Sequence, residues 1–356
     1  MTKLDIVSGF LGAGKTTLIK KLLKEALSDT KVVLIENEFG EIGIDGGFLK
    51  ESGIEIKEMN SGCICCSLVG DFGSSLKEVL KTYAPERILI EPSGVGKLSD
   101  VMKAVQDVID TKEVELNSAV AIVDASKCKM YIKNFGEFFI NQIEHAGTII
   151  LSRTGSIAED KMNKAIELIR QHNEKAVIIT TPWDELDGKD ILNAMEGAGD
   201  LAAEMMAEIK EESEETHEHH HHHDEESGHE HHHHDEESEH EHHHHDHGAD
   251  CSCGCHDHEH GHHHADEVFT SWGMETPAAY SSEEIEKILA KLEKEDVYGF
   301  VLRAKGMVPS GKDGWVYFDY VPGESNVRLG KADVTGKFCV IGSKLKEDKL
   351  KELFGK

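Results

Sequence analysis

The chain has 356 residues with 38 Lys and Arg, 68 Asp and Glu, 25 His and 8 Cys, and its formal net charge is −30. This acidity argues against a nucleic-acid backbone or an anionic membrane as a partner, because both would be repelled, and it favours cations. The longest apolar runs, such as residues 119–123, are much shorter than the ~20 residues that cross a bilayer, and the start lacks the apolar core of a signal peptide.

The first 205 residues alternate short apolar runs with amphipathic helical patterns, and we assign them to one domain, 1–205. The apolar runs predict strands at residues 4–7, 31–35, 54–57, 87–90, 118–123, 148–151 and 176–180. A helical period predicts helices at residues 17–26, 74–82, 99–109, 137–145 and 158–172. This alternation predicts an α/β fold in which a mainly parallel sheet is covered by helices on both faces.

The next segment, 206–266, is predicted to be a disordered tether. Residues 211–267 contain 20 Asp and Glu, no Lys or Arg, and 23 of the 25 histidines. Their few apolar side chains cannot offset the entropy lost on folding.

The remaining residues, 267–356, again carry strand and helix patterns. Strands are predicted at residues 268–275, 299–305, 315–320 and 337–341, and helices at 282–292 and 346–354. This order predicts a small α+β domain with a mostly antiparallel sheet.

A phosphate-binding loop follows the first predicted strand. The motif G-x-x-x-x-G-K-[ST] is matched by Gly9-Phe10-Leu11-Gly12-Ala13-Gly14-Lys15-Thr16, and Thr17 continues into a helix. Glycines let backbone N–H groups converge on phosphate oxygens, and the helix start adds partial positive charge. Lys15 is expected to reach the β- and γ-phosphates, and the Thr16 hydroxyl to bind Mg²⁺.

A second nucleotide-site signal is Glu91-Pro92-Ser93-Gly94, at the end of the predicted strand 87–90. Glu91 is expected near Mg²⁺ or the attacking water, and the N–H of Gly94 near the γ-phosphate. Only the upstream loop makes this interpretation specific, since acids at strand ends are common.

Three closely spaced thiols, Cys63, Cys65 and Cys66, follow Gly62. We expect a cytoplasmic protein, where thiols stay reduced, so cysteines serve as metal ligands or core residues rather than disulfides. These three can hold one soft or borderline cation, with Glu36, Glu41 or a histidine as the fourth ligand. The alternatives are a buried cysteine cluster or a redox pair.

These motifs together resemble the CobW-type metallochaperone GTPases, which are related to the HypB and UreG nickel-insertion GTPases. The resemblance is carried by residues 9–17, Glu36-Asn37-Glu38-Phe39-Gly40-Glu41, Cys63-Ile64-Cys65-Cys66 and Glu91-Pro92-Ser93-Gly94. It implies a GTPase whose nucleotide state controls a bound Zn²⁺, Co²⁺ or Ni²⁺ and its transfer to a client metalloprotein. It also implies that Cys63, Cys65 and Cys66 form the internal metal site, with Glu36 or Glu41 nearby, and that residues 36–45 are the switch.

One segment departs from that family. Its base-reading motif, Asn/Ser/Thr-Lys-x-Asp, corresponds here to Ser152-Arg153-Thr154-Gly155. Arg153 can stack on the base as lysine would, but Gly155 cannot accept the guanine N–H groups as an Asp would. GTP is therefore the expected nucleotide, and ATP stays open. Thr180, Thr181 or Trp183 could contribute to the base pocket, or form an ordinary loop.

The tether carries many more candidate metal ligands. Imidazole and carboxylate groups suit borderline divalent ions, with Ni²⁺, Cu²⁺ and Zn²⁺ preferred over Mn²⁺. The predicted ligands are His219, His220, His221, His222, His223, His231, His232, His233, His234, His242, His243, His244, His245, Cys251, Cys253 and Cys255. Many overlapping sites on a flexible chain predict a metal reservoir, and a purely solvating linker is the alternative.

Three functions compete at this level. The first is a nucleotide-switched metallochaperone in which Lys15, Thr16 and Glu91 serve hydrolysis. The second is a metal-storage protein with a vestigial nucleotide domain, and the third an ATP-dependent phosphoryl-transfer enzyme. The loop disfavours the second and the cysteine trio the third, while a homo-oligomer stays open.

Four further residues are not predicted to be ligands. His145 and His172 lie at helix C-termini, where a histidine complements the dipole. Cys339 is predicted to lie in the core, and Cys128 is unassigned.

Overall fold

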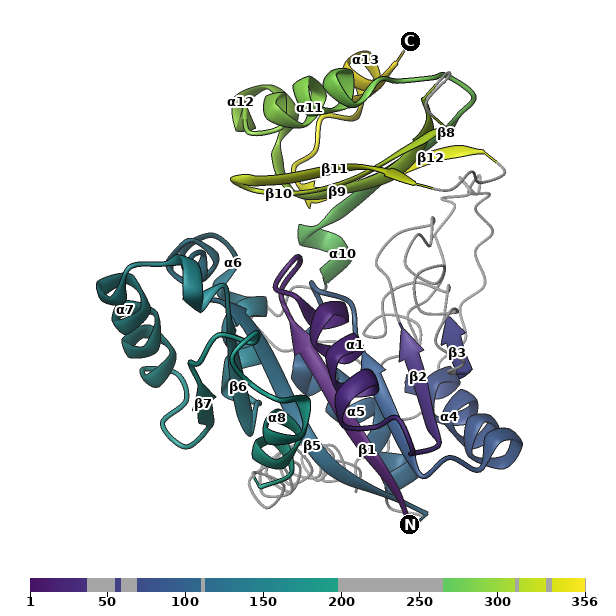
Figure 1. Cartoon of the computed structure of the whole chain (residues 1–356), viewed down its shortest axis with the longest axis vertical. Coiled ribbons are helices and arrows are strands. Elements are labelled where there is room, and N and C mark those ends of the chain that lie inside the picture. The colour runs from purple at the N-terminus through teal and green to yellow at the C-terminus, as the bar shows by residue number, and fades with distance from the viewer. Residues whose placement is uncertain are drawn as a thin grey trace, which may run out of the picture.

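The computed structural model describes residues 1–36, 55–58, 69–109, 113–197, 265–310, 314–330 and 335–355. They form two layered domains, a sheet with helices on both sides that contains the N-terminus, and a second sheet with helices on its outer side (Figure 1). Residues 198–264, which include nearly all of the predicted tether, lie outside the described residues. None of the described helices combines the length and apolarity needed to cross a membrane.

The first sheet has seven strands in the order β3-β2-β4-β1-β5-β6-β7, and every neighbouring pair is parallel. The strands are β1 Thr2–Gly9, β2 Val32–Glu36, β3 Glu55–Glu58, β4 Arg87–Glu91, β5 Val114–Asp124, β6 Thr148–Ser152 and β7 Val177–Ile179. The predicted parallel α/β sheet is confirmed. Its carboxyl ends meet at one edge, where the phosphate loop leaves β1.

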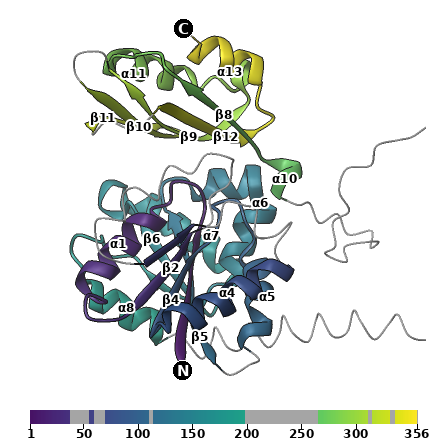
Figure 2. The ribbon, with the colours of Figure 1, turned by 90° about the vertical axis from the view of Figure 1, so that its right-hand side faces the viewer.

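Helices cover both faces of this sheet. One face carries α1 Lys15–Glu25 and α8 Gly188–Glu196, which share a buried apolar cluster and lie together in Figure 2. The other carries α4 Val69–Tyr83, α5 Leu98–Ile109, α6 Cys128–Glu144 and α7 Glu159–Arg170. Each buried Leu, Ile or Val in these clusters contributes about 1.5–3 kcal/mol.

Two helices of the first domain differ most from the sequence-based expectation. Helix α6 begins at Cys128 rather than at residue 137. Its first turns were missed because Phe135 has non-helical angles (φ −139°, ψ 33°), which interrupt the helical period. Helix α8 was not expected, since it is short and begins at a glycine. Its N-terminus is capped by Asp187, whose carboxylate accepts a hydrogen bond from the Lys189 N–H at 2.8 Å.

The second domain has a five-stranded sheet in the order β11-β10-β9-β12-β8, with every neighbouring pair antiparallel. The strands are β8 Thr270–Thr276, β9 Phe300–Pro309, β10 Trp315–Val321, β11 Glu324–Gly330 and β12 Gly336–Ser343. Helices α11 Ser282–Lys291, α12 Glu295–Tyr298 and α13 Glu347–Phe354 lie on the outer side of this sheet, and α10 Ala265–Val268 lies between the two domains (Figure 1). The predicted α+β domain is confirmed. Strand β11 was not predicted, because this edge strand is almost wholly exposed and has no apolar alternation.

Aromatic side chains join the two domains. Phe135 of α6 lies 5.4 Å from Phe269, which precedes β8, and 5.1 Å from Phe300 of β9, measured between ring centroids. Phe10 of the phosphate loop is 6.2 Å from Phe269. This packing turns the inner face of the second sheet, opposite α11, α12 and α13, toward the phosphate loop (Figures 1 and 2).

Candidate functional site

The phosphate loop connects β1 directly to α1. Gly14 has a left-handed conformation (φ 109°), and the helix begins at the next residue, Lys15. The Lys15 side chain folds back over the loop, and its ammonium group donates a hydrogen bond to the Gly9 carbonyl at 2.9 Å. A buried lysine at the start of a helix, among backbone N–H groups, forms an anion-binding site.

Glu91 lies against this loop. The Thr16 hydroxyl donates to the Glu91 carboxylate, with 3.1 Å between Oγ1 and Oε1. Gly94 packs on the other side, where an added Cβ would lie 2.9 Å from the Leu11 nitrogen, so only glycine fits. The structure therefore brings together three of the sequence-predicted nucleotide residues, Thr16, Glu91 and Gly94.

Glu36, a predicted metal ligand, is the direct neighbour of Glu91. Both residues end parallel strands, and Glu36 of β2 pairs in register with Glu91 of β4. Glu36 is buried, with 7% of its surface exposed. Two carboxylates, one predicted to serve a metal and one the nucleotide, thus end adjacent strands.

The other predicted metal ligands lie outside the described residues. This applies to Glu41 and to Cys63, Cys65 and Cys66, and equally to all the tether histidines and cysteines. Within the described residues, no three His, Cys, Asp or Glu side chains gather into a metal-binding group.

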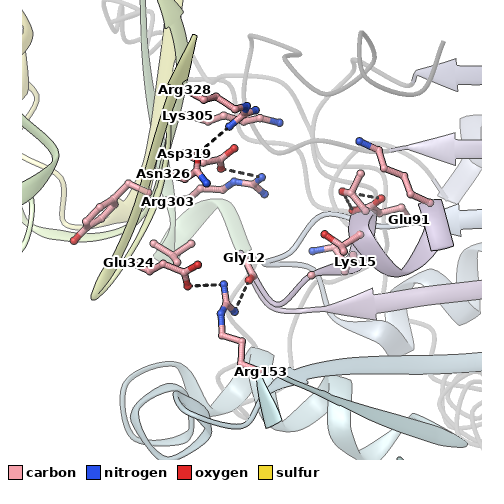
Figure 3. Close-up of a pocket in the computed structure, with 16 residues that line it drawn as sticks. Gly12, Lys15, Glu91, Arg153, Arg303, Lys305, Asp319, Glu324, Asn326 and Arg328 are labelled. Atoms are coloured by element: carbon pink, nitrogen blue, oxygen red, sulfur yellow. Dashed lines mark hydrogen bonds and ion pairs between the residues drawn. The ribbon is translucent and has the colours of Figure 1, made fainter. Parts of the chain in front are cut away.

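Arg153, a predicted base-stacking residue, makes three contacts at the end of β6. Its Nη1 donates to the Gly12 carbonyl at 3.0 Å and to Asp124 Oδ2 at 2.6 Å. Its Nη2 lies 2.7 Å from Glu324 Oε2, in the second domain. Lys127 is 3.6 Å from the same Asp124 carboxylate. Burial lowers the pKa of Lys127, and Asp124 opposes that shift. Arg153 thus connects the phosphate loop and β5 of the first domain to the second domain (Figure 3).

The segments predicted to read the base lie together. Ser152 is buried at the end of β6, and Gly155 faces Pro182, whose Cγ would lie 3.5 Å from an added Cβ. The indole N–H of Trp183 donates to the Leu151 carbonyl at 2.9 Å. The Trp183 ring lies beside Gly14, where an added Cβ would approach it to 3.0 Å.

One pocket of about 320 Å³ spans both domains (Figure 3). The first domain contributes the loop, Thr16, Glu91 and Arg153, and the second domain contributes side chains of β9, β10 and β11. The second-domain residues are Arg303, Lys305, Asp319, Tyr320, Val321, Glu324, Asn326 and Arg328. Sequence analysis missed this half, although a period-two signal was present in Arg303-x-Lys305 and Glu324-x-Asn326-x-Arg328.

The residues not predicted to be ligands have ordinary environments. His145 ends α6, with Nδ1 3.0 Å from the Asn141 carbonyl oxygen, and His172 Nδ1 is 3.7 Å from a Glu144 carboxylate oxygen. Cys339 is buried in β12, as predicted. Cys128 is also buried, which raises the pKa of its thiol to about 12 and keeps it neutral.

Several characterised proteins are similar to this chain. Zinc chaperone YeiR of Escherichia coli K12 is 29% identical over 188 residues, which cover 53% of this chain and 57% of YeiR. Zinc chaperone CobW of Sinorhizobium is 38% identical over 128 residues, 34% of this chain and 36% of that protein. Zinc-regulated GTPase metalloprotein activator 1 of Schizosaccharomyces pombe is 27% identical over 191 residues, 51% of this chain and 46% of its own length. The chain therefore spans between about a third and somewhat over half of these relatives.

Solved structures also align with this chain. The Zn(II)-bound YjiA GTPase from E. coli aligns over 99% of this chain and 98% of its own, with 18% identity and a TM-score of 0.38. HypB from Helicobacter pylori, in complex with nickel, covers 58% of this chain and 88% of its own, with 16% identity and a TM-score of 0.38.

The family match covers the domain that holds the phosphate loop. Residues 3–180 match the family described as CobW/HypB/UreG, nucleotide-binding domain, a stretch that runs from β1 to just past β7. The resemblance noted from the sequence motifs is confirmed. The chain belongs to the CobW/HypB/UreG family.

Proposed function

We propose that the chain is a nucleoside-triphosphate hydrolase that uses its nucleotide state to control a transition-metal ion and its transfer to a client metalloprotein. GTP is the proposed nucleotide and Zn²⁺ the proposed cargo. The relatives named zinc chaperone and zinc-regulated GTPase support both choices. The observation that carries the proposal is that Glu91, which accepts a hydrogen bond from Thr16 of the phosphate loop, is the register partner of Glu36, a predicted metal ligand.

Hydrolysis would take place at the phosphate loop. Water attacks the γ-phosphorus, the bond to the β,γ-bridging oxygen breaks, and nucleoside diphosphate and inorganic phosphate leave. Lys15 would neutralise the β- and γ-phosphate oxygens. Thr16 and Glu91 present hydroxyl and carboxylate oxygens 3.1 Å apart, a donor set that suits Mg²⁺. When bound, Mg²⁺ would neutralise further phosphate charge.

Communication between the two sites follows from strand geometry. The Cα atoms of Glu36 and Glu91 are register partners in adjacent parallel strands, which lie about 4.8 Å apart. A shift of Glu91 when Thr16 engages Mg²⁺ would therefore reach Glu36 and residues 36–45, the predicted switch. We propose that Cys63, Cys65 and Cys66, which follow β3, bind the metal as thiolate ligands, with Glu36 or Glu41 as the fourth.

The base preference of the proposed hydrolase rests on residues 152–155 and Trp183. Gly155 supplies no carboxylate for guanine, so we propose GTP from the family and keep ATP as the competing nucleotide in every assay.

The tether is proposed as the reservoir that supplies the cysteine site. Its 23 histidines must lose protons to bind metal, and free imidazole has a pKa of about 6.5. Metal stoichiometry measured by calorimetry should therefore be lower at pH 5 than at pH 7.5. Equal stoichiometry at both values would contradict an imidazole reservoir.

The central experiment measures GTP and ATP turnover in a variant that lacks residues 211–264 and keeps α10, with and without one equivalent of Zn²⁺, Co²⁺ or Ni²⁺. We expect one equivalent of the cognate metal to stimulate turnover, and Cys65→Ala to abolish the stimulation. Cys339→Ala, which removes a buried thiol of β12, is the matched control and should keep it.

The competing functions give different results. A metal-storage protein would bind metal without turnover, and a phosphoryl-transfer enzyme would turn over independently of metal and of Cys65. Either result would overturn the proposal.

A further inference from the structure

The inner face of the second sheet presents a row of cations to the phosphate loop. Along β9, residues alternate between the two faces, and Ala304 and Val308 pack into the helix-covered core. Arg303 and Lys305 therefore share the opposite face. Arg328 of β11 points the same way, and all three extend toward Lys15 and Glu91 in Figure 3.

The pocket between the domains differs in charge from the rest of the chain. Six of its lining side chains are Lys or Arg and three are Asp or Glu, whereas the whole chain carries −30. Lys15 and Lys20 contribute from the first domain, and Arg303, Lys305 and Arg328 from the second. A local excess of cations in an acidic protein marks a site for a polyanion.

The cations are positioned by the sheet rather than carried on a loop. Lys305 is 6% exposed and pairs in register with Asp319 of β10. Arg303 Nη2 lies 3.5 Å from Asp319 Oδ1. The guanidinium of Arg328 is 5.8 Å from the centroid of the Tyr317 ring.

The contact between the domains occurs at the phosphate loop itself. Gly12 packs so closely on Val321, the last residue of β10, that an added Cβ would lie 2.3 Å from Val321 Cγ1. The cationic face therefore shares a pocket with Thr16 and Glu91, where the terminal phosphates and Mg²⁺ are expected.

We propose that Arg303, Lys305 and Arg328 bind the terminal phosphate of the nucleotide, so that the second domain completes the triphosphate site. This inference rests on the proposed nucleotide function. Hydrolysis and loss of the γ-phosphate would remove the anion that these cations share with Lys15. The interaction between the two domains would then weaken. The second domain would thereby distinguish triphosphate from diphosphate.

The test compares affinities for a fluorescent non-hydrolysable GTP analogue and for fluorescent GDP, both with Mg²⁺, in the full chain. Lys305→Met removes the charge and keeps the length of the side chain. We expect triphosphate affinity to fall at least about tenfold, the effect of one charge-assisted hydrogen bond, and diphosphate affinity to change less than about twofold. Lys305→Arg should keep most of the preference for triphosphate.

Lys287→Met is the matched control, because Lys287 is an exposed residue of α11 and does not line the pocket. It should bind both nucleotides as the unmodified chain does. If Lys305→Met proves unstable in thermal unfolding, Arg328→Gln on the exposed edge strand provides the same comparison.

Equal losses for both nucleotides, or no loss, would overturn the assignment. Failure of the unmodified chain to bind any nucleotide would instead overturn the proposed function, so the two failures are distinguishable.

Discussion

Arg153 and Glu324 form an ion pair between the two domains, with 2.7 Å between Nη2 and Oε2. The other terminal nitrogen of the same guanidinium binds the Asp124 carboxylate and the Gly12 carbonyl. A residue expected from sequence to stack on a base therefore also connects the phosphate loop, the end of β5 and the start of β11. This connection leads to the first prediction.

Loss of the two carboxylates that bind Arg153 should have unequal effects on stability. Glu324 is 53% exposed, so Glu324→Gln should lower the free energy of unfolding by less than about 1 kcal/mol. Asp124 is 2% exposed and faces both Arg153 and Lys127, so Asp124→Asn should cost about 2–3 kcal/mol. Urea denaturation of both variants tests this, and equal losses would refute the three-way connection.

Gly12 should tolerate no side chain. Its φ of 69° disfavours alanine by about 1 kcal/mol, and the added Cβ would also lie 2.3 Å from Val321 Cγ1. We expect Gly12→Ala to weaken nucleotide binding and Val321→Ala to restore part of it. Gly323→Ala is the matched control, because Gly323 has a similar φ of 78° and nothing lies within 4 Å of the added Cβ. If the two glycine variants behave alike, contact with Val321 is not the cause.

Trp183 should report nucleotide binding. Its ring lies beside Gly14 of the phosphate loop, whereas Trp272 packs against Phe338 in the second domain. Triphosphate binding should change the intrinsic tryptophan emission, and Trp183→Phe should abolish most of that change. Trp272→Phe should preserve it. A response that persists without Trp183 would place the nucleotide elsewhere.

Glu25 should make stability depend on pH. Its carboxylate accepts hydrogen bonds from Lys21 and, at 2.8 Å, from the Gly188 N–H at the start of α8. The hydrogen bond from Lys21 is the main cause that lowers the pKa of Glu25 below its ordinary 4.5. Folding thus favours the ionised form. The stabilisation is complete above that ordinary value and is lost as the pH falls through the lowered pKa.

The measurement compares thermal midpoints of Glu25→Gln and the unmodified chain at pH 7 and at about pH 3. The variant should be less stable at pH 7, and the difference should shrink at the lower pH. Glu286→Gln, on the exposed face of α11, should show no such dependence. A difference that is constant with pH would rule out the carboxylate as its source.

Much of the fold could be predicted from local patterns in the sequence. Most strands of the first sheet are short apolar runs, because buried parallel strands need apolar residues on both faces. The exceptions have clear causes. Strand β11 is held by its partner β10 rather than by burial, and the first turns of α6 are hidden by the break at Phe135.

Some residues of the candidate site could likewise be predicted from the sequence, and others could not. Its loop, with Lys15 and Thr16, is recognisable from the sequence because phosphate binding requires a fixed local spacing. The strand-end acid Glu91 was recognised only because that loop precedes it. Asp124 was missed, since an acid after an apolar strand has no distinctive spacing. The predicted cysteine site and the tether ligands stay predictions.

The sequence by itself determined the phosphate loop, the fold class of both domains and the family, because each depends on neighbours along the chain. Only the tertiary structure decided that Arg303, Lys305 and Arg328 face that loop and that Arg153 reaches Glu324. Those contacts join residues more than 140 positions apart, and they follow from how Phe135, Phe269 and Phe300 pack the two domains together. No local pattern encodes a contact whose geometry is set by the docking of one domain on another.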